Sequence, residues 1–152
     1  MRPSAGYCAG RGKPEFVLPS ETMLNWLVAG IGDITIKRTL PAIQSEPRSR
    51  VAGFVTRNTE KAKAYGAPAW TDLGQALREC ACDAVYVGTP VVLHAAQTIA
   101  SLRAGKHVLC EKPTAMNYTE ACAMQQVAVE TGRLLGVAYY RRMYPKMARP
   151  GN

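Results

Sequence analysis

Apolar and polar positions along the chain fall into two alternating patterns. Short apolar runs bounded by glycine, proline or polar clusters predict strands, and longer stretches with apolar residues every three or four positions predict helices. The predicted strands cover 24–29, 50–55, 69–70, 84–87, 107–109 and 134–139. The predicted helices lie between them, one directly after residue 32 and the others at 58–65, 72–79, 92–103 and 118–131. This alternation predicts an α/β fold, a doubly wound parallel six-stranded sheet with right-handed crossovers.

The helical periods also predict which side chains face the core. The expected inward residues are Ile36, Leu40 and Ile43 in the first helix, Val92, Ala96, Ile99 and Ala100 in the fourth, and Ala121, Met124 and Ala128 in the last. Asn117 and Glu120 have the spacing of a capping box at the start of the last helix, and Gly132 is expected to end it.

The turn after the first predicted strand is rich in glycine. Gly30 permits a tight turn, and Gly32, which has no β-carbon, lets a phosphate approach the backbone N–H groups that begin the next helix. A strand, a glycine turn and a helix N-terminus in this order predict a site for a dinucleotide pyrophosphate. Thr35 stands where the full fingerprint has a third glycine, so the helix is expected to pack less closely on the strand. Taken alone, an ordinary tight turn is the alternative.

Length and composition limit the domain organisation. With 152 residues, 47% of them hydrophobic, the chain has enough apolar material for one compact domain. No stretch reaches the ~20 consecutive apolar residues that span a membrane, and the first residues lack the apolar centre of a secretion signal. We therefore expect a disordered leader at 1–22, one domain at 23–140 and a short tail at 141–152.

The formal charge of +8 makes the distribution of basic residues important. Residues 1–23 carry three basic and two acidic groups, residues 139–152 carry four basic groups and no acid, and the body between has twelve basic and nine acidic residues. Most of the excess lies at the ends, and no helix face combines clustered Lys or Arg with aromatic residues. We predict neither a nucleic-acid partner nor a membrane partner.

Five cysteines occur, at positions 8, 80, 82, 110 and 122. The spacing of Cys80 and Cys82 is too short for a zinc knuckle, and no metal site is predicted. An odd number of cysteines at irregular intervals fits free, mostly buried thiols in a reducing compartment, so a cytoplasmic location is expected.

Functional residues are expected beyond the carboxyl ends of the strands, because ligands of open α/β sheets bind there. Thr56 and Arg57 follow the second strand, where an NAD-specific site usually has an acid for the ribose 2′-hydroxyl. A hydroxyl and a guanidinium instead suit a 2′-phosphate, so NADP is favoured over NAD as the cofactor. A solvated surface arginine is the alternative.

The loops after the fourth and fifth strands carry Thr89, Pro90 and His94, and Glu111, Lys112 and Pro113. Lys112 stands at the tip of a buried strand and is expected to point into a nicotinamide crevice. Burial there would make its ammonium a hydrogen-bond donor or proton shuttle to a hydroxyl being oxidised. A solvated turn lysine is the alternative, and His94 by itself is expected to be a surface residue.

Three motifs, in this order, resemble the Gfo/Idh/MocA oxidoreductases: Gly-Ile-Gly-Asp-Ile at 30–34, Thr-Pro-x-x-x-His at 89–94 and Cys-Glu-Lys-Pro at 110–113. The resemblance covers residues 24–145, and Glu-Lys-Pro is its most specific element. It implies a Rossmann NAD(P)-binding domain, followed in complete members by an α/β domain that binds a sugar or polyol and mediates oligomerisation. A homo-oligomer is therefore expected when that second domain is present.

The resemblance also implies a role for each matching residue. The implied positions are Gly30, Gly32, Asp33 and Ile34 at the pyrophosphate, Thr56 and Arg57 at the adenosine ribose, Thr89, Pro90 and His94 along the cofactor, and Glu111 beside the nicotinamide ribose. Lys112 matches the catalytic lysine, its bond to Pro113 matches a cis peptide bond of the family, and Tyr140 with Arg141 matches a pair that borders the active site.

The resemblance leads us to expect that the family's second domain is absent from this chain and that 141–152 match only its truncated start. The family completes its active site with an Asp and a His from that domain, a role that neither His94 nor His107 can fill. Two functions stay open. One is the cofactor domain of an oxidoreductase that moves hydride between NAD(P) and a sugar or polyol, inactive on its own. The other is a catalytically silent nucleotide-binding module. A methyltransferase is disfavoured, because its second strand usually ends in an acid.

Overall fold

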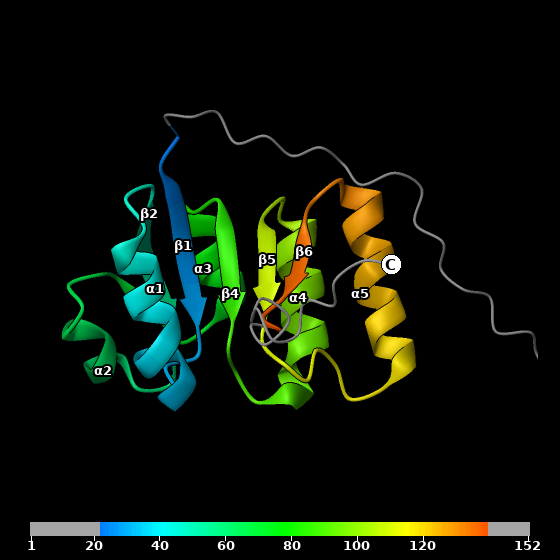
Figure 1. Cartoon of the computed structure of the whole chain (residues 1–152), viewed down its shortest axis with the longest axis horizontal. Helices are drawn as coiled ribbons and strands as arrows, with labels where there is room; N and C mark the ends of the chain where they lie inside the picture. Colours follow the sequence, from blue (N-terminus) through cyan, green and yellow to red (C-terminus); the bar gives the residue numbers. More distant parts are fainter. Residues whose placement is uncertain (1–21, 140–152) are drawn as a thin grey trace, which may run out of the picture.

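The computed structural model describes residues 22–139, in which six parallel strands form one sheet (Figure 1). The strands are β1 (Leu24–Ala29), β2 (Ser49–Val55), β3 (Ala69–Trp70), β4 (Ala84–Val87), β5 (His107–Cys110) and β6 (Leu135–Val137). Their order is β3-β2-β1-β4-β5-β6, so the direction of winding reverses between β1 and β4. The predicted doubly wound fold is confirmed, and the reversal marks the place where such sheets bind ligands.

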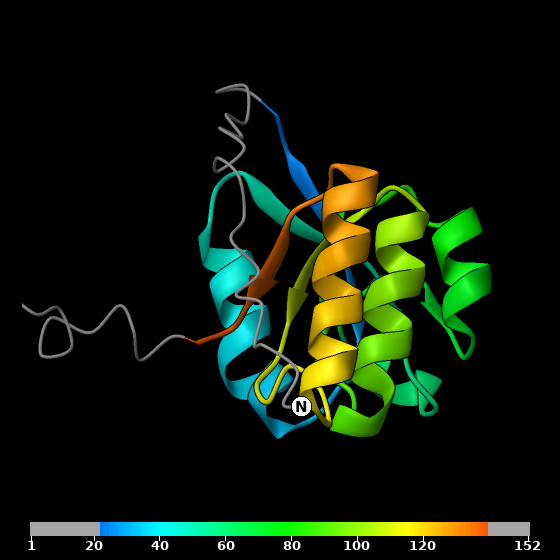
Figure 2. The ribbon, with the colours of Figure 1, turned by 90° about the vertical axis from the view of Figure 1, so that its right-hand side faces the viewer.

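Helices cover both faces of the sheet, which Figure 2 shows nearly edge-on. They are η1 (Thr35–Thr39, a π-helix), α1 (Leu40–Ser45), α2 (Thr59–Lys63), α3 (Leu73–Glu79), the 3-10 helix η2 (Val91–Leu93), α4 (His94–Arg103) and α5 (Tyr118–Thr131). α1 and α2 pack on one core cluster, on one face of the sheet, and α3, α4 and α5 pack on the other cluster, on the opposite face.

β1 shows how the sheet divides the core. Leu27 and Ala29 belong to the apolar cluster beneath α3, α4 and α5, whereas Val28 between them belongs to the cluster beneath α1 and α2. All three side chains are fully buried, as expected for a central strand with helices on both faces. The carboxyl end of β1 is therefore fixed from both sides.

Side-chain caps begin three of the helices. The oxygens of Asn58, Asp72 and Asn117 each accept a hydrogen bond from the backbone N–H three residues later, at 3.3, 2.7 and 2.9 Å. In the predicted capping box, the Glu120 carboxylate accepts from the N–H of Met116 at 3.0 Å rather than from that of Asn117. Gly132 ends α5 with a φ of +63°, as predicted.

The first helix turns a different face to the core than its period predicts. Leu40 and Ile43 are buried, but Ile36 is 38% exposed, and Thr35 is fully buried in its place. The cause is the π-helical segment, in which the N–H of Leu40 donates to the carbonyl of Thr35 five residues earlier. Thr35, not Ile36, therefore lies one turn before Leu40.

The inward face predicted for α4 is also wrong. Val92 is 65% exposed, Ala96 and Ala100 are exposed, and Ile99 is only partly buried. The buried positions of α4 are His94, Thr98, Ser101 and Leu102. Three of these four are polar, so a prediction from hydrophobicity alone chose the wrong side of the helix.

Parts of the predicted domain organisation lie outside the described residues. These parts are the leader at 1–21, the tail at 141–152 and the site candidates Tyr140 and Arg141. Between residues 22 and 139, no helix is long and apolar enough to cross a membrane. The same part of the chain has no group of three or more His, Cys, Asp or Glu side chains that could hold a metal ion.

Candidate nucleotide-binding site at the carboxyl edge

The turns after β1 and β4 meet at the reversal point of the sheet. Gly30 has a φ of +92°, and a β-carbon on it would lie 2.7 Å from the carbonyl oxygen of Gly88. The N–H of Gly88 donates to the carbonyl of Ala29 at 2.8 Å, and the N–H of Gly30 donates to that of Val55 at 2.9 Å. Only glycine combines this backbone conformation with this close approach, so Gly30 fulfils the role predicted for it.

The start of the first helix is open to solvent. Gly32 is exposed, and a β-carbon on it would have no atom within 4 Å. Among the described residues, the backbone N–H groups of Gly32, Asp33 and Ile34 have no acceptor. Outward-facing N–H groups at a helix N-terminus form a binding place for an anion.

Thr35 closes this turn from the inside. Its hydroxyl donates to the carbonyl of Gly30 at 3.0 Å, and a β-carbon on Gly88 would lie 3.0 Å from the same hydroxyl. The looser packing expected without a third glycine is not found at this position, because Thr35 is fully buried against the ends of β1 and β4.

Thr56 and Arg57 both follow β2, but they differ in their hydrogen bonds to the described residues. The Thr56 hydroxyl accepts a hydrogen bond from the N–H of Asn58 at 3.1 Å and is part of the turn into α2. Arg57 is exposed, and its guanidinium has no hydrogen bond or ion pair with the described residues. The guanidinium is therefore available to a ligand on this edge.

His94 lies below the edge rather than on the surface, where it was expected by itself. The side chain is only 2% exposed. Its Nε2 is 2.7 Å from the carbonyl oxygen of Thr89, and its Nδ1 is 2.9 Å from that of Pro113. The Thr89 hydroxyl donates to Oε1 of Gln97 at 2.6 Å, so the loop after β4 is held at two points of α4.

Glu111 is held by two hydrogen bonds at the end of β5. The Tyr86 hydroxyl donates to its Oε1 at 2.9 Å, and the backbone N–H of Lys112 donates to its Oε2 at 3.1 Å. Tyr86 is 1% exposed, and burial raises its pKa to about 12, so the phenol stays protonated and donating at neutral pH.

Lys112 is exposed, and its Nζ has no partner among the described residues. The burial expected for its ammonium is therefore not found in this part of the chain, because the loop after β5 passes beyond the sheet. The bond between Lys112 and Pro113 is cis, as the resemblance implied.

Cys110, directly before Glu111, has the properties of a structural thiol. It is fully buried, its Sγ lies 3.7 Å from the carbonyl oxygen of Thr114, and burial raises its pKa to about 11. A thiol that stays protonated at neutral pH is a poor nucleophile.

Tyr86 is the residue of this edge that the sequence patterns did not single out. Its signal is an aromatic side chain inside an otherwise aliphatic strand, two positions before Gly88. A β-carbon on Gly88 would lie 2.6 Å from the Tyr86 ring, so a glycine at 88 makes room for the ring beneath the turn.

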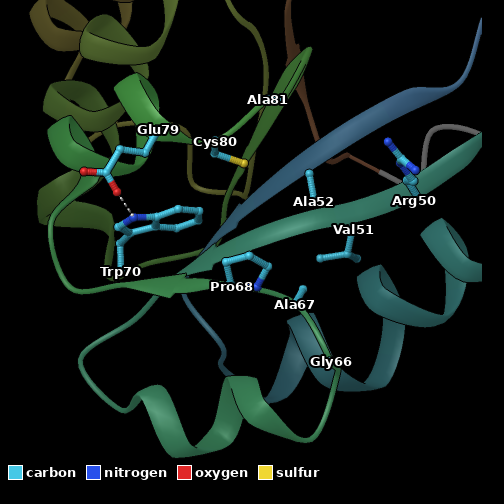
Figure 3. Close-up of a pocket in the computed structure, with 10 residues that line it drawn as sticks. All are labelled: Arg50, Val51, Ala52, Gly66, Ala67, Pro68, Trp70, Glu79, Cys80 and Ala81. Atoms are coloured by element: carbon cyan, nitrogen blue, oxygen red, sulfur yellow. Dashed lines mark hydrogen bonds between the residues drawn. The ribbon is translucent and has the colours of Figure 1, made fainter.

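A separate pocket of about 370 Å³ lies beside β2 and β3, on the side of α3 (Figure 3). It is lined by the amino end of β2, the segment before β3 and the end of α3, away from the glycine turns. Its wall includes Trp70, whose indole N–H donates to Oε2 of Glu79 at 2.7 Å. Hydrogen bonds from Trp70 and Gln75 lower the pKa of Glu79. None of the predicted site residues lines this pocket.

The family model described as "Oxidoreductase family, NAD-binding Rossmann fold" matches residues 24–139. The chain therefore belongs to this Gfo/Idh/MocA family, and the described domain is its NAD-binding Rossmann domain.

Two curated relatives indicate the chemistry found in the family. The chain is 38% identical over 116 residues to a dTDP-3,4-didehydro-2,6-dideoxy-alpha-D-glucose 3-reductase from Streptomyces violaceoruber, a match that covers 74% of this chain and 34% of that protein. It is 34% identical over 125 residues to a 1,5-anhydro-D-fructose reductase from Ensifer adhaerens, covering 79% and 37%. The chain thus spans little more than a third of these relatives.

Solved structures with the same fold contain both nicotinamide cofactors. A 3-ketoreductase from Actinomadura kijaniata, in complex with NADP and TDP-benzene, superposes with a TM-score of 0.77 at 35% identity, covering 82% of this chain and 40% of that one. The WlbA dehydrogenase from Bordetella pertussis, in complex with NADH and UDP-GlcNAcA, has a TM-score of 0.77 at 29% identity, covering 82% and 37%.

Proposed function

We propose that this chain binds NADP(H) along the carboxyl edge of its sheet, as the cofactor domain of an oxidoreductase that acts on a CH–OH group of a sugar or polyol. The observation that carries the proposal is that this edge presents, in three loops, donors that have no partner in the described part of the chain. The N–H groups of Gly32, Asp33 and Ile34 follow β1, Arg57 follows β2 and Lys112 follows β5.

The residues present fit a dinucleotide. Gly32 leaves open the space that a β-carbon would occupy, directly beside the N–H groups of the helix start, and this is what a pyrophosphate requires. Thr89, Pro90 and Glu111 would border the nicotinamide half, because they follow β4 and β5 on the other side of the reversal point. We propose the same bordering position for Arg141, which lies outside the described residues.

Arg57 is the basis for proposing NADP over NAD. Its unpaired guanidinium follows β2, where a 2′-phosphate would accept two charge-assisted hydrogen bonds. Among the solved relatives, the 3-ketoreductase holds NADP and the WlbA dehydrogenase holds NADH, so the family accommodates both cofactors.

We assign the proton transfer to Lys112. A bound nicotinamide would supply or accept the hydride. When a ketone is reduced, the Lys112 ammonium would donate the proton that the substrate oxygen gains, and in the reverse direction the neutral amine would accept it. We propose that the chain alone turns over no sugar, since its match to the relatives covers their NAD-binding part and little more than a third of their length.

Free thiols support a cytoplasmic location for the protein. We expect homo-oligomer contacts in the substrate-binding part of the complete relatives. A catalytically silent nucleotide-binding module is the second candidate. It shares the cofactor site but needs no function for Lys112.

Cofactor titration tests the proposal. NADPH and NADH would be titrated by fluorescence into the full chain, into Arg57→Ala and into Arg103→Ala, an exposed arginine at the far end of α4. We expect Arg57→Ala to weaken NADPH binding about tenfold or more while leaving NADH binding unchanged, since hydrogen bonds to charged groups contribute about 1.5–3 kcal/mol. Equal effects of Arg57→Ala and Arg103→Ala would remove the basis for NADP.

An activity assay separates the two candidate functions. The full chain would be assayed for NADP reduction over a panel of sugars and polyols, and again after fusion to a substrate domain of the family. Turnover by the fusion that is lost in Lys112→Ala supports the oxidoreductase. Full activity of the Lys112→Ala fusion would overturn the assignment of Lys112, and turnover by the bare chain would overturn its proposed inactivity.

A further inference from the structure

His94 places two hydrogen-bond acceptors against its two ring nitrogens. Nε2 is 2.7 Å from the carbonyl oxygen of Thr89, and Nδ1 is 2.9 Å from the carbonyl oxygen of Pro113. With a side chain only 2% exposed, the ring has almost no access to water that could replace either contact.

The chemistry of these contacts limits the protonation state of the ring. A carbonyl oxygen only accepts hydrogen bonds, so each nitrogen must carry a hydrogen to make its bond. A neutral imidazole has one N–H, and its other nitrogen would direct a lone pair at a carbonyl oxygen less than 3 Å away. Both contacts are therefore hydrogen bonds only when the ring is an imidazolium.

The two carbonyls belong to two different loops of the carboxyl edge. β4 and β5 pair as far as Val87 and Cys110, and the N–H of Glu111 still donates to the carbonyl of Val87 at 2.9 Å. Beyond this bond the segments after β4 and β5 are no longer paired with each other, and the His94 ring contacts Thr89 of one segment and Pro113 of the other.

Pro113 follows Lys112 directly, so the bridge acts on the backbone that carries the proposed catalytic amine. The Lys112 backbone is held on one side by the bond from its N–H to Glu111, at 3.1 Å, and on the other by the carbonyl of Pro113. Its side chain has no partner of its own among the described residues. The backbone therefore fixes where the Lys112 side chain begins, while the exposed side chain itself is free to rotate until a ligand binds.

Few charged groups surround the bridge. The loop after β4 and η2, residues 88–93, has no titratable side chain, and α4 has only Arg103 at its far end besides His94. The loop after β5 contributes Glu111 and Lys112. The elements that pack on α4 contribute Tyr86 from β4, His107 and Cys110 from β5, Arg78 and Glu79 from α3, and Tyr118, Glu120, Cys122 and Glu130 from α5.

We propose that His94 is a positioning residue: its imidazolium ties the loop after β4 to the loop after β5 and thereby orients Lys112 beside the nicotinamide site. The proposal deepens the proposed function and rests on it for the role of Lys112. The direction of the expected pH dependence follows from the number of protons on the His94 ring. Both bonds exist while the ring is doubly protonated, and one is lost as the pH rises and the ring gives up a proton.

Two measurements test the proposal. The first is the ¹⁵N spectrum of the His94 ring in the full chain, recorded from about pH 5 to about pH 8, where histidine exchanges its proton. We expect both nitrogens to carry hydrogens at the acid end and the backbone amide signals of Lys112 and Thr114 to shift together with the ring. A ring with a single N–H throughout this range would overturn the proposal.

The second measurement is the pH dependence of NADPH affinity in the wild type, His94→Gln and His107→Gln. The chain has two histidines, and His107 at the start of β5 is a matched control whose Nδ1 accepts from the N–H of Leu134. Relative to His94→Gln, we expect the affinity of the wild type and of His107→Gln to fall about two- to tenfold over this range, the worth of one net hydrogen bond. His94→Gln has no ring proton to lose, so its profile should contain only the change that ionisation of the 2′-phosphate causes in every variant.

The two measurements keep the failures apart. Absence of NADPH binding at every pH would defeat the proposed function, while the ring spectrum would still decide the protonation of His94. A pH profile that is the same in the wild type and in His94→Gln would overturn the positioning role. If His94→Gln does not fold, the wild-type ring and amide spectra alone decide.

Discussion

The two halves of the carboxyl edge are built differently. The open half, residues 30–34 and 56–57, presents exposed groups that have no partner between residues 22 and 139: the N–H groups of the helix start and the Arg57 guanidinium. The pinned half, residues 88–93 and 111–114, is held from below by two buried side chains, Tyr86 and His94, which bond to Glu111 and to two backbone carbonyls.

The difference follows from what each half has to do. Donors for phosphate need only be unpaired and reachable, because the ligand's charge supplies the attraction. A group that transfers a proton must be held close to its productive position, and errors of about 1 Å can cost about 100-fold in rate. In the pinned half, the hydrogen bonds of Tyr86 to Glu111 and of His94 to two loop carbonyls provide that order before any ligand binds.

The largest effect is expected at the junction of the two halves, in Gly30→Ala. The new β-carbon would meet the Gly88 carbonyl at 2.7 Å in a backbone conformation with φ +92°. Strained backbone and overpacking each cost about 1–3 kcal/mol, so we expect the free energy of unfolding to fall by about 2–5 kcal/mol. Urea denaturation measures this. Gly32→Ala, in open space, should change the free energy of unfolding by no more than about 1 kcal/mol. Equal losses in the two variants would contradict the close approach of Gly30 to Gly88.

A second effect is a loss of stability at alkaline pH, which we expect from Cys110 at the end of β5. Burial raises the pKa of Cys110 from about 9 to about 11, so its neutral form stabilises the fold below pH 9 and this contribution is lost as the pH rises toward 11. Cys110→Ala should remove about 2 kcal/mol of the loss that the wild type shows between about pH 8 and about pH 10.5. Cys122→Ala, a partly buried control, should leave the loss unchanged, and a wild-type-like loss in Cys110→Ala would contradict the argument.

The third test removes one support of the pinned half. Tyr86→Phe deletes the hydroxyl that donates to Glu111 at 2.9 Å and leaves a carboxylate oxygen without that donor. We expect a loss of about 1–2 kcal/mol in the free energy of unfolding. Tyr139→Phe, at a residue that is 61% exposed, is the matched control and should change stability little. A loss no larger than that of Tyr139→Phe would show that Tyr86 does not fix Glu111.

Local sequence patterns predict the regular elements and the glycine turn better than they predict the supports of the pinned half. The glycine turn, the strand at 84–87 and the helix at 118–131 depend on local patterns, and the structure has them at the predicted residues. The support of the pinned half depends on contacts between distant segments. His94 is buried because carbonyls of two loops meet it, and Tyr86 is part of the site because Glu111 lies on the next strand.

The first helix shows the same limit from another direction. Its existence follows from the apolar period after Gly32, but its π-helical start does not, so the sequence places Ile36 rather than Thr35 against the core. A shift of one residue in the helical register is a tertiary effect. Thr35 gains a hydrogen bond to Gly30 and contact with Gly88, which Ile36 could not provide.

The smallest effect on stability is expected in the open half, at the ion pair between Asp33 and Lys37. Nζ and Oδ2 are 3.0 Å apart, and the side chains are 88% and 70% exposed. Exposed pairs four residues apart on a helix contribute about 0.3–0.5 kcal/mol, so Lys37→Met and Asp33→Asn should barely move a urea transition.

Their effects on NADPH affinity should have opposite signs. Asp33→Asn removes a negative charge beside the proposed phosphate site and should strengthen binding about two- to fivefold, whereas Lys37→Met should weaken it by a similar factor, both more clearly at low salt. Lys63→Met, in the similarly exposed pair with Glu60 on α2, is the control for loss of a surface charge. If both open-half variants shift the affinity in the same direction, the phosphates do not lie beside this helix start. If both instead lower stability by more than about 1 kcal/mol, the open half is held by its side chains, and the contrast between the halves fails.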